Sequence, residues 1–338
     1  MATIVAILGA SGDGKTTSTT LCGKFLASSS RVFVGGNIGT PLLDRLDEMQ
    51  ESDSLVLELS SFQLISMRKS PNVSVITNVA PNHLDVHKTM DEYIDAKRNI
   101  MIHQNAFSRT VLNADNEITA GFMGNGITRF FSRQGKPNHV LLKGGSIYRG
   151  GKPVLDVKDI LLPGVHNIEN YMAAIAAVEG LVSDESIRHV AMNFGGVEHR
   201  IELVRIKDGV RFYNDSIASS PSRTIAGLRS FPEKVILIAG GYDKHIPYDE
   251  LGPEICKHVK KLFLGGATGP QIRAAVENCG GQQPEIYDCE NFEDAVRQAA
   301  KAARAGDVVL MSPASAAFDQ FKNFMVRGNF FKKLVMEL

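Results

Sequence analysis

The chain has 338 residues with 37 basic and 37 acidic side chains, so its net charge is zero when histidine is neutral. Such a balance provides no global field to attract nucleic acid or an acidic membrane surface. The length suits about two domains, each able to bury its own core. No apolar run approaches the roughly 18 residues of a membrane span. From the charge balance and the short apolar runs together, we expect neither a nucleic-acid nor a membrane partner.

Four cysteines occur, and they show neither a C-x-x-C spacing nor an accompanying histidine cluster. Those patterns are the usual signs of redox motifs and metal sites. We therefore predict reduced, mostly buried thiols in a cytoplasmic protein. The four are Cys22, Cys256, Cys279 and Cys289.

The first motif follows an apolar run from Ile4 to Leu8 and reads G-A-S-G-D-G-K-T over residues 9–16, before a helix-like segment. G-x-x-x-x-G-K-T between a strand and a helix is typical of a P-loop, whose backbone N–H groups turn towards a phosphate. Lys15 would then reach the β- and γ-phosphates, and the Thr16 hydroxyl would bind Mg²⁺. The motif predicts nucleoside triphosphate binding, and a plain glycine turn is the alternative.

Two more strands of the first half end in candidate site residues. The strand 31–34 runs into G-G-N-I-G, and the apolar strand 54–59 contains Glu58. Ligands bind at the carboxyl ends of parallel strands, and a buried carboxylate needs a partner. We expect Glu58 to face Mg²⁺ or its water. The alternative for the G-G-N-I-G run is an ordinary turn, and the alternative for Glu58 is a side chain that faces solvent.

The next strand, 73–76, leads into a loop rich in Asn, Asp and His. His83 or His87 in this loop is a candidate ligand or proton carrier, although a lone histidine is more often structural. A helix follows over 90–103. It contains Lys97, to which helical spacing alone assigns no role.

Short β-rich runs with Gly- and Asn-rich turns fill residues 110–158 and predict an antiparallel extension of the parallel sheet. A segment with Asn167 and Glu169 then opens a long apolar helix over 171–181. Helix capping alone would explain both polar residues.

A domain boundary is predicted around residues 195–200, because the alternation of strands and helices restarts there. Five strands alternating with helices predict a second doubly wound domain. Polar clusters follow three of these strands, at 214–216, 240–244 and 312–315. They stand at the sheet edge where such domains bind ligands, so a site is expected there.

Taken together, nine stretches resemble the Mur ligase family, in the family's order from one end of the chain to the other. They are G-D-G-K-T-T (12–17), G-G-N-I-G-T-P-L (35–42), L-E-L-S-S-F-Q-L (57–64), N-H-L-D-V-H (82–87), D-A-K-R (95–98), G-V-H-N-I-E-N (164–170), H-R-I-E (199–202), N-D-S (214–216) and S-P-A-S-A-A-F-D-Q-F-K-N-F (312–324).

The resemblance implies an α/β fold, with a P-loop ATPase domain on a mostly parallel sheet at 1–197 and a Rossmann-like, amino-acid-binding C-terminal domain at 198–338. It implies an ATP-dependent amide ligase of peptidoglycan synthesis that works through an acyl phosphate. The G-N-I-G and S-S-F-Q-L runs favour members that add D-glutamate to UDP-N-acetylmuramoyl-L-alanine over the sister ligases and folylpolyglutamate synthase.

Individual residues match family positions, and the roles below are what the resemblance implies. The catalytic residues are Lys15, Glu58, His83 and Lys97. Two Mg²⁺ sites are implied, with ligands from Thr16, Glu58, His83 and a Lys97 carbamylated by CO₂. ATP contacts are Gly12, Asp13, Gly14, Lys15, Thr16, Thr17, Asn167, Asn170, Arg200 and Asp215. The muramoyl substrate is assigned Asn37 and Ser60, and D-glutamate is assigned Ser219, Lys244 and Phe324.

The chain departs from the family pattern in three places. The family has an N-terminal nucleotide-sugar domain, whereas this chain begins at the P-loop strand, so a separate domain of that kind is an expected partner. Ile217 and Ala317 replace a common lysine and a common serine. The rival functions are a regulatory or vestigial ATP-binding module and an unrelated P-loop kinase or ATPase.

Overall fold

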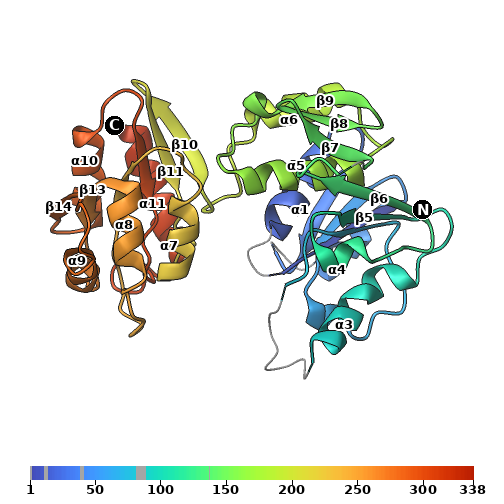
Figure 1. Ribbon diagram of the computed structural model, residues 1–338, viewed down its shortest axis with the longest axis horizontal. Helices are drawn as coiled ribbons and strands as arrows, with labels where there is room; N and C mark the ends of the chain where they lie inside the picture. Colours follow the sequence, from blue (N-terminus) through green and yellow to red (C-terminus); the bar gives the residue numbers. More distant parts are fainter. Residues whose placement is uncertain (1, 11–13, 39–41, 81–88, 137) are drawn as a thin grey trace. The chain divides into compact units, whose positions relative to one another are not determined.

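The computed structural model describes residues 2–10, 14–38, 42–80, 89–136 and 138–338. The chain divides into two compact units, Met1–Leu161 with Val165–Phe194, and Leu162–Gly164 with Gly195–Leu338. Each unit is built around its own β-sheet (Figure 1). No helix within the described ranges is long and apolar enough to cross a membrane.

The first unit contains a nine-stranded sheet in the order β2-β3-β1-β4-β5-β6-β7-β8-β9. Its strands are β1 (Thr3–Leu8), β2 (Val32–Gly36), β3 (Ser54–Glu58), β4 (Val73–Ile76), β5 (Arg109–Asn113), β6 (Ile127–Ser132), β7 (Val140–Lys143), β8 (Ser146–Arg149) and β9 (Lys152–Asp156). Its helices are α1 (Lys15–Leu26), η1 (Leu43–Glu48), α2 (Ser61–Leu64), α3 (Met90–Ile102), α4 (Glu117–Ala120), η2 (Val157–Asp159), α5 (Val165–Ala177) and α6 (Asp184–Asn193).

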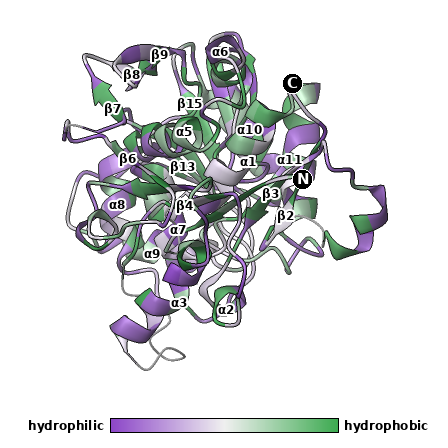
Figure 2. Ribbon diagram, turned by 90° about the vertical axis from the view of Figure 1, so that its right-hand side faces the viewer, coloured by the Kyte–Doolittle hydropathy of each residue, from purple (hydrophilic) through white to green (hydrophobic). Residues whose placement is uncertain are grey.

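Helices cover the sheet on two sides because residues along the buried strands alternate between its faces. Ala6 and Leu8 of β1 belong to a core cluster with Tyr93 of α3. Elsewhere α1 packs beside α5 (Figure 1). The Phe25 and Tyr171 rings of these two helices lie 6.2 Å apart. Much of α3 is hydrophilic, which fits a helix with one face in solvent (Figure 2).

The predicted antiparallel extension over 110–158 is wrong for its first half. β5 pairs parallel with β4, β6 pairs parallel with β5, and β7 pairs parallel with β6. Only the β7–β8 and β8–β9 pairs are antiparallel. The short helix α4 in the β5–β6 connection allows a parallel crossover, which a pattern of short β runs does not reveal.

The second unit contains six strands in the order β10-β11-β15-β12-β13-β14. They are β10 (Glu202–Lys207), β11 (Val210–Asn214), β12 (Val235–Ala239), β13 (Val259–Leu264), β14 (Glu285–Asp288) and β15 (Val308–Met311). The helices are α7 (Pro221–Leu228), α8 (Leu251–His258), α9 (Gly269–Glu277), α10 (Phe292–Ala302) and α11 (Phe324–Glu337).

Two separate cores flank this second sheet. Residues of α7, α8 and α9 pack on one face, and residues of α10 and α11 pack on the other. The predicted doubly wound domain is therefore confirmed, although it has six strands and not five. β10 is an antiparallel strand at the edge of the sheet. β14 is half-exposed and polar, so its sequence lacks the apolar run that predicts a buried strand.

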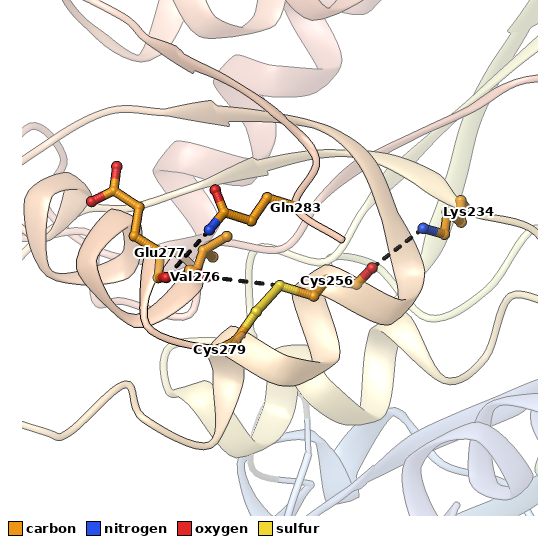
Figure 3. The surroundings of a disulfide bond; sticks show 6 residues. All are labelled: Lys234, Cys256, Val276, Glu277, Cys279 and Gln283. Atoms are coloured by element: carbon orange, nitrogen blue, oxygen red, sulfur yellow. Dashed lines mark hydrogen bonds between the residues drawn. A yellow bond between two sulfur atoms is a disulfide. The ribbon is translucent and has the colours of Figure 1, made fainter. Parts of the chain in front are cut away.

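The prediction of four reduced cysteines is wrong for one pair. Cys256 and Cys279 form a disulfide in the second unit (Figure 3). Cys256 lies near the end of α8 and Cys279 follows α9, and the packing of these two helices brings the residues together. A separation of 23 residues carries no such signal in the sequence. Cys22 and Cys289 are free thiols.

Candidate active site

The predicted P-loop joins β1 to α1, and its glycines are required by close contacts. Gly14 has φ 74°, and a Cβ there would lie 1.7 Å from Oδ1 of Asn170 in α5. A Cβ on Gly9 would lie 2.1 Å from Oγ1 of Thr77, which follows β4. The described part of the loop is thus held between α5 and the end of β4, where only glycine fits.

Glu58 contacts two other predicted site residues, Thr16 and Asn37, at the carboxyl ends of β2 and β3. Thr16 Oγ1 donates to Glu58 Oε2 at 2.8 Å, and Asn37 Nδ2 donates to Glu58 Oε1 at 3.1 Å. The Asn37 backbone N–H donates to the Glu58 carbonyl at 2.8 Å. Glu58 is only 2 % exposed. Lys15 lies in the same first turn of α1, and its Nζ donates to the Ala10 carbonyl at 2.8 Å.

Asn167 and Asn170 lie in the first turns of α5, and both are buried. Asn170 Nδ2 donates to Asn167 Oδ1 at 3.0 Å, and Asn170 Oδ1 accepts from Ser18 Oγ at 3.4 Å. The pair therefore packs against the P-loop and α1. α5 begins six residues before the predicted start at Tyr171, so both asparagines are within the helix.

The structure also places other residues assigned to this unit. Lys97 is 1 % exposed, with Nζ 4.6 Å from the centre of the Tyr93 ring. Ser60 precedes α2, and its hydroxyl donates to Gln63 Oε1 at 2.9 Å. Thr17 is buried in α1. Gly12, Asp13, His83 and His87 lie outside the described residues.

Oxygen donors at Glu58 suit a hard cation. A carboxylate and a threonine hydroxyl already meet there, and such ligands are the ones that Mg²⁺ prefers. The described residues contain no group of three or more His, Cys, Asp and Glu side chains placed to hold a metal ion. Thr16 and Glu58 therefore fit part of a Mg²⁺ site that has to be completed by other ligands, such as phosphate oxygens or water.

In the second unit, Asp215 is buried just after β11. Its Oδ2 accepts from Ser312 Oγ at 2.7 Å, and its Oδ1 accepts from the Ile201 N–H at 3.3 Å. Burial raises the pKa of Asp215 to about 7. Arg200 lies between two non-glycine residues with positive φ, His199 and Ile201, so its backbone is held in an unusual turn.

The predicted D-glutamate residues occupy two loops at the carboxyl edge of the second sheet and the start of α11. Ser219 follows β11, Lys244 follows β12, and Phe324 begins α11. Lys244 is exposed. The Phe324 ring lies edge-on to the His199 ring, with centroids 5.9 Å apart. Ala317 is buried and Ile217 is half-buried in the neighbouring loops.

Four polar residues at these sites were given no individual role by the sequence analysis. Ser18 and Thr77 support the P-loop, Ser312 binds Asp215, and Arg327 joins loops of the second unit. Ser312 belongs to a polar cluster that was singled out, so position after a strand was a usable signal for it. An arginine inside a helix gives no such signal, because most are solvated.

Family models identify the class of protein. The model described as "Mur ligase middle domain" matches residues 12–178, and that described as "Mur ligase, glutamate ligase domain" matches residues 199–315. Together they match most of the chain. The chain belongs to the Mur ligase family.

Curated relatives narrow this class. The chain is 54% identical to the UDP-N-acetylmuramoylalanine--D-glutamate ligase of Acetivibrio thermocellus, over 99% of this chain and 74% of the relative. It is 49% identical to the protein of the same name from Ruminiclostridium cellulolyticum, over 100% of this chain and 75% of the relative. The chain thus spans about three quarters of the length of these relatives.

Solved structures of other ligases show the same fold. A UDP-N-acetylmuramoyl-L-alanyl-D-glutamate--2,6-diaminopimelate ligase matches with a TM-score of 0.73 at 17% identity, over 99% of this chain and 79% of that one. A UDP-N-acetylmuramate-alanine ligase from Thermotoga maritima matches with a TM-score of 0.66 at 17% identity, over 99% and 76%. The predicted α/β architecture is confirmed.

Proposed function

We propose that this chain is an ATP-dependent ligase that joins D-glutamate to UDP-N-acetylmuramoyl-L-alanine in peptidoglycan synthesis. The observation that carries the proposal is 54% identity, across almost the whole chain, to a ligase of that name. Residues 1–197 are assigned as the ATP-binding domain and 198–338 as the amino-acid-binding domain. Because ATP is a substrate, the reaction is assigned to the cytoplasm.

The first step transfers the γ-phosphate of ATP to the carboxylate of the muramoyl substrate, which gives an acyl phosphate and ADP. Lys15 lies at the start of α1, where its ammonium can leave the Ala10 carbonyl and bind the phosphates. The N-terminus of α1 adds a positive partial charge at the same place. These groups stabilise the charge of the transferring phosphoryl group.

In the second step, the amine of D-glutamate attacks the acyl carbon and forms a tetrahedral intermediate. The intermediate expels phosphate, and the nitrogen loses a proton, leaving an amide. Ser219, Lys244 and Phe324 are assigned to D-glutamate, with the exposed Lys244 ammonium suited to a carboxylate. Asn37 and Ser60 are assigned to the muramoyl substrate. Orientation of the amine is the main contribution expected from the second unit.

Bound Mg²⁺ would neutralise phosphate charge in this reaction. Thr16 and Glu58 are the described residues that would hold it, and His83 and a carbamylated Lys97 are proposed as further ligands on the strength of the family resemblance. Carbamylation replaces a cationic amine by an anionic carboxylate with hard oxygen atoms. Asn167, Asn170, Arg200 and Asp215 are proposed to contact ATP.

Labelled D-glutamate tests this function directly. The chain is incubated with Mg-ATP and UDP-N-acetylmuramoyl-L-alanine, both alone and joined to the remaining quarter of the Acetivibrio thermocellus relative. We expect phosphate release that depends on the muramoyl substrate, with the label recovered in the nucleotide sugar. ATP binding without substrate-dependent turnover in both forms would favour the regulatory or vestigial module instead.

A further inference from the structure

Arg327 is an almost completely buried arginine in the first turns of α11, with 1 % of its surface exposed. Burial lowers the pKa of Arg327 to about 10, so its guanidinium is a cation at neutral pH. A buried cation is costly unless all of its donors are satisfied. The contacts of Arg327 therefore show which parts of the unit it holds.

The guanidinium spans two loops. Nε donates to Ser216 Oγ at 3.0 Å and Nη2 to the Ser216 carbonyl at 3.0 Å, in the loop after β11. Nη2 also donates to the Ser315 carbonyl at 3.1 Å, and Nη1 to the Ala316 carbonyl at 3.0 Å, in the loop after β15. All four acceptors are neutral oxygens, so this contact set is a connection between loops rather than an ion pair.

A third loop, after β12, is fixed to the same place. The Tyr242 N–H donates to the Ala316 carbonyl at 2.9 Å, and the Gly240 N–H donates to the Pro313 carbonyl at 2.8 Å. A Cβ on Gly241 would lie 2.3 Å from the Ala316 carbonyl oxygen and 3.1 Å from Arg327 Nη1. The backbone after β12 therefore packs directly on Arg327 and on the Ala316 carbonyl that accepts from it.

The start of α11 closes the arrangement, because Ser216 Oγ donates to the Phe324 carbonyl at 2.7 Å. The three loops and the start of α11 include all three residues assigned to D-glutamate: Ser219, Lys244 and Phe324. Each of these residues is on a different segment, and Arg327 or its immediate acceptors contact all of the segments.

We propose that Arg327 is a positioning residue for the amino-acid substrate, which holds the loops after β11, β12 and β15 in the register that D-glutamate requires. This inference rests on the proposed function for the identity of the substrate. Arginine is suited to the task because its planar fork can donate to two loops at once, whereas lysine is a point donor. Misplacement by about 1 Å of groups that bind a reactant costs on the order of 100-fold in rate.

Arg327→Met removes every donor and retains much of the apolar volume. We expect the KM for D-glutamate to rise at least about tenfold, in line with that cost of misplacement. The KM for ATP should rise less, because only one of the residues proposed to contact ATP, Asp215, is in a loop that Arg327 contacts. The KM for D-glutamate of Arg327→Lys should lie between those of Arg327→Met and the parent. The milder Ser216→Ala removes one acceptor and should raise the same KM by less, which keeps the test usable if Arg327→Met does not fold.

Arg205→Met is the matched control. Arg205, in β10, donates to the Val335 and Met336 carbonyls at 2.9 and 3.0 Å, so it holds the other end of α11. Its loss should lower stability without changing the KM for D-glutamate. An equal rise of that KM in both variants, or no rise in Arg327→Met, would overturn the inference.

Hydrogen exchange separates this inference from the proposed function. In Arg327→Met, the amides of Gly240, Tyr242 and Ser216 should exchange faster than in Arg205→Met, relative to global stability. If the parent form makes no labelled product, the proposed function is wrong and the exchange result alone decides the positioning role. Unchanged exchange of these three amides would then refute it.

Discussion

Lys15 is the residue whose proposed role is purely electrostatic. Lys15→Ala should reduce kcat/KM for Mg-ATP turnover by at least about 100-fold, because a donor to the transferring phosphoryl group is lost. Lys24→Ala is the control, since Lys24 is exposed in the last turn of the same helix. Turnover and thermal unfolding are measured for both. Parent-like turnover in Lys15→Ala would remove the P-loop from the mechanism.

Lys97 provides a second test at the level of one residue. If it is carbamylated, ¹³CO₂ should give a carbamate resonance in the parent that is absent from Lys97→Ala. The variant should also lose ligation and regain part of it with acetate, which supplies a carboxylate oxygen. A missing resonance in the parent, or full activity of Lys97→Ala without acetate, would leave Lys97 as a buried lysine beside Tyr93.

Asp215 should make stability depend on pH. Its pKa is raised from 3.8 to about 7, so between these values the folded state binds more protons than the unfolded state. The associated stabilisation is complete below about pH 4 and is lost as the pH rises through 7. Asp215→Asn should flatten this part of the Tm profile relative to the parent. Parallel profiles for the two proteins would show that Asp215 ionises normally.

The contact between the P-loop and α5 can be tested with two glycines that have the same positive φ. Gly14 and Gly180 both have φ 74°. A Cβ on Gly14 would meet Asn170, whereas one on Gly180 meets nothing within 4 Å. Gly180→Ala should cost about 1–2 kcal/mol from backbone strain alone.

Gly14→Ala should cost more than Gly180→Ala and should also weaken ATP binding, because the loop has to move away from α5. Denaturant unfolding and calorimetric titration with ADP measure the two effects. Equal losses of stability, with ADP binding retained in Gly14→Ala, would show that the loop tolerates the displacement.

Much of the element order was predictable from the sequence, because strong local signals marked it. The P-loop, the apolar run of β3 and the polar clusters after β11, β12 and β15 all stood out. The direction of strand pairing was not predictable, since β5 and β6 pair parallel where an antiparallel extension was predicted. Neither were the links that depend on tertiary approach, such as Ser18 with Asn170 or Cys256 with Cys279. Such partners are distant in sequence and have no periodicity to reveal them.

For the whole molecule, the disulfide should distinguish the two units. It closes a loop of 23 residues in the second unit only. Reduction, or the Cys256→Ser variant, should lower the free energy of unfolding of that unit by about 3 kcal/mol on the chain-entropy model. Hydrogen exchange, with and without reductant, measures the free energy of unfolding of each unit separately.

Counting thiols provides the check on that experiment. The oxidised, denatured protein should react at two cysteines, Cys22 and Cys289. Four reactive cysteines, or an equal loss of stability in both units on reduction, would contradict the disulfide assignment.

The strand order of the second sheet also bears on how the protein is made. β15 pairs with both β11 and β12, so the strand of this sheet that is synthesised last is the one that joins its middle. Until it emerges, β11 and β12 each present an open edge that invites pairing with another chain. The second unit is therefore prone to aggregation during its synthesis until β15 has been made. A chain that ended before Val308 would contain the whole first unit and an incomplete, aggregation-prone second unit.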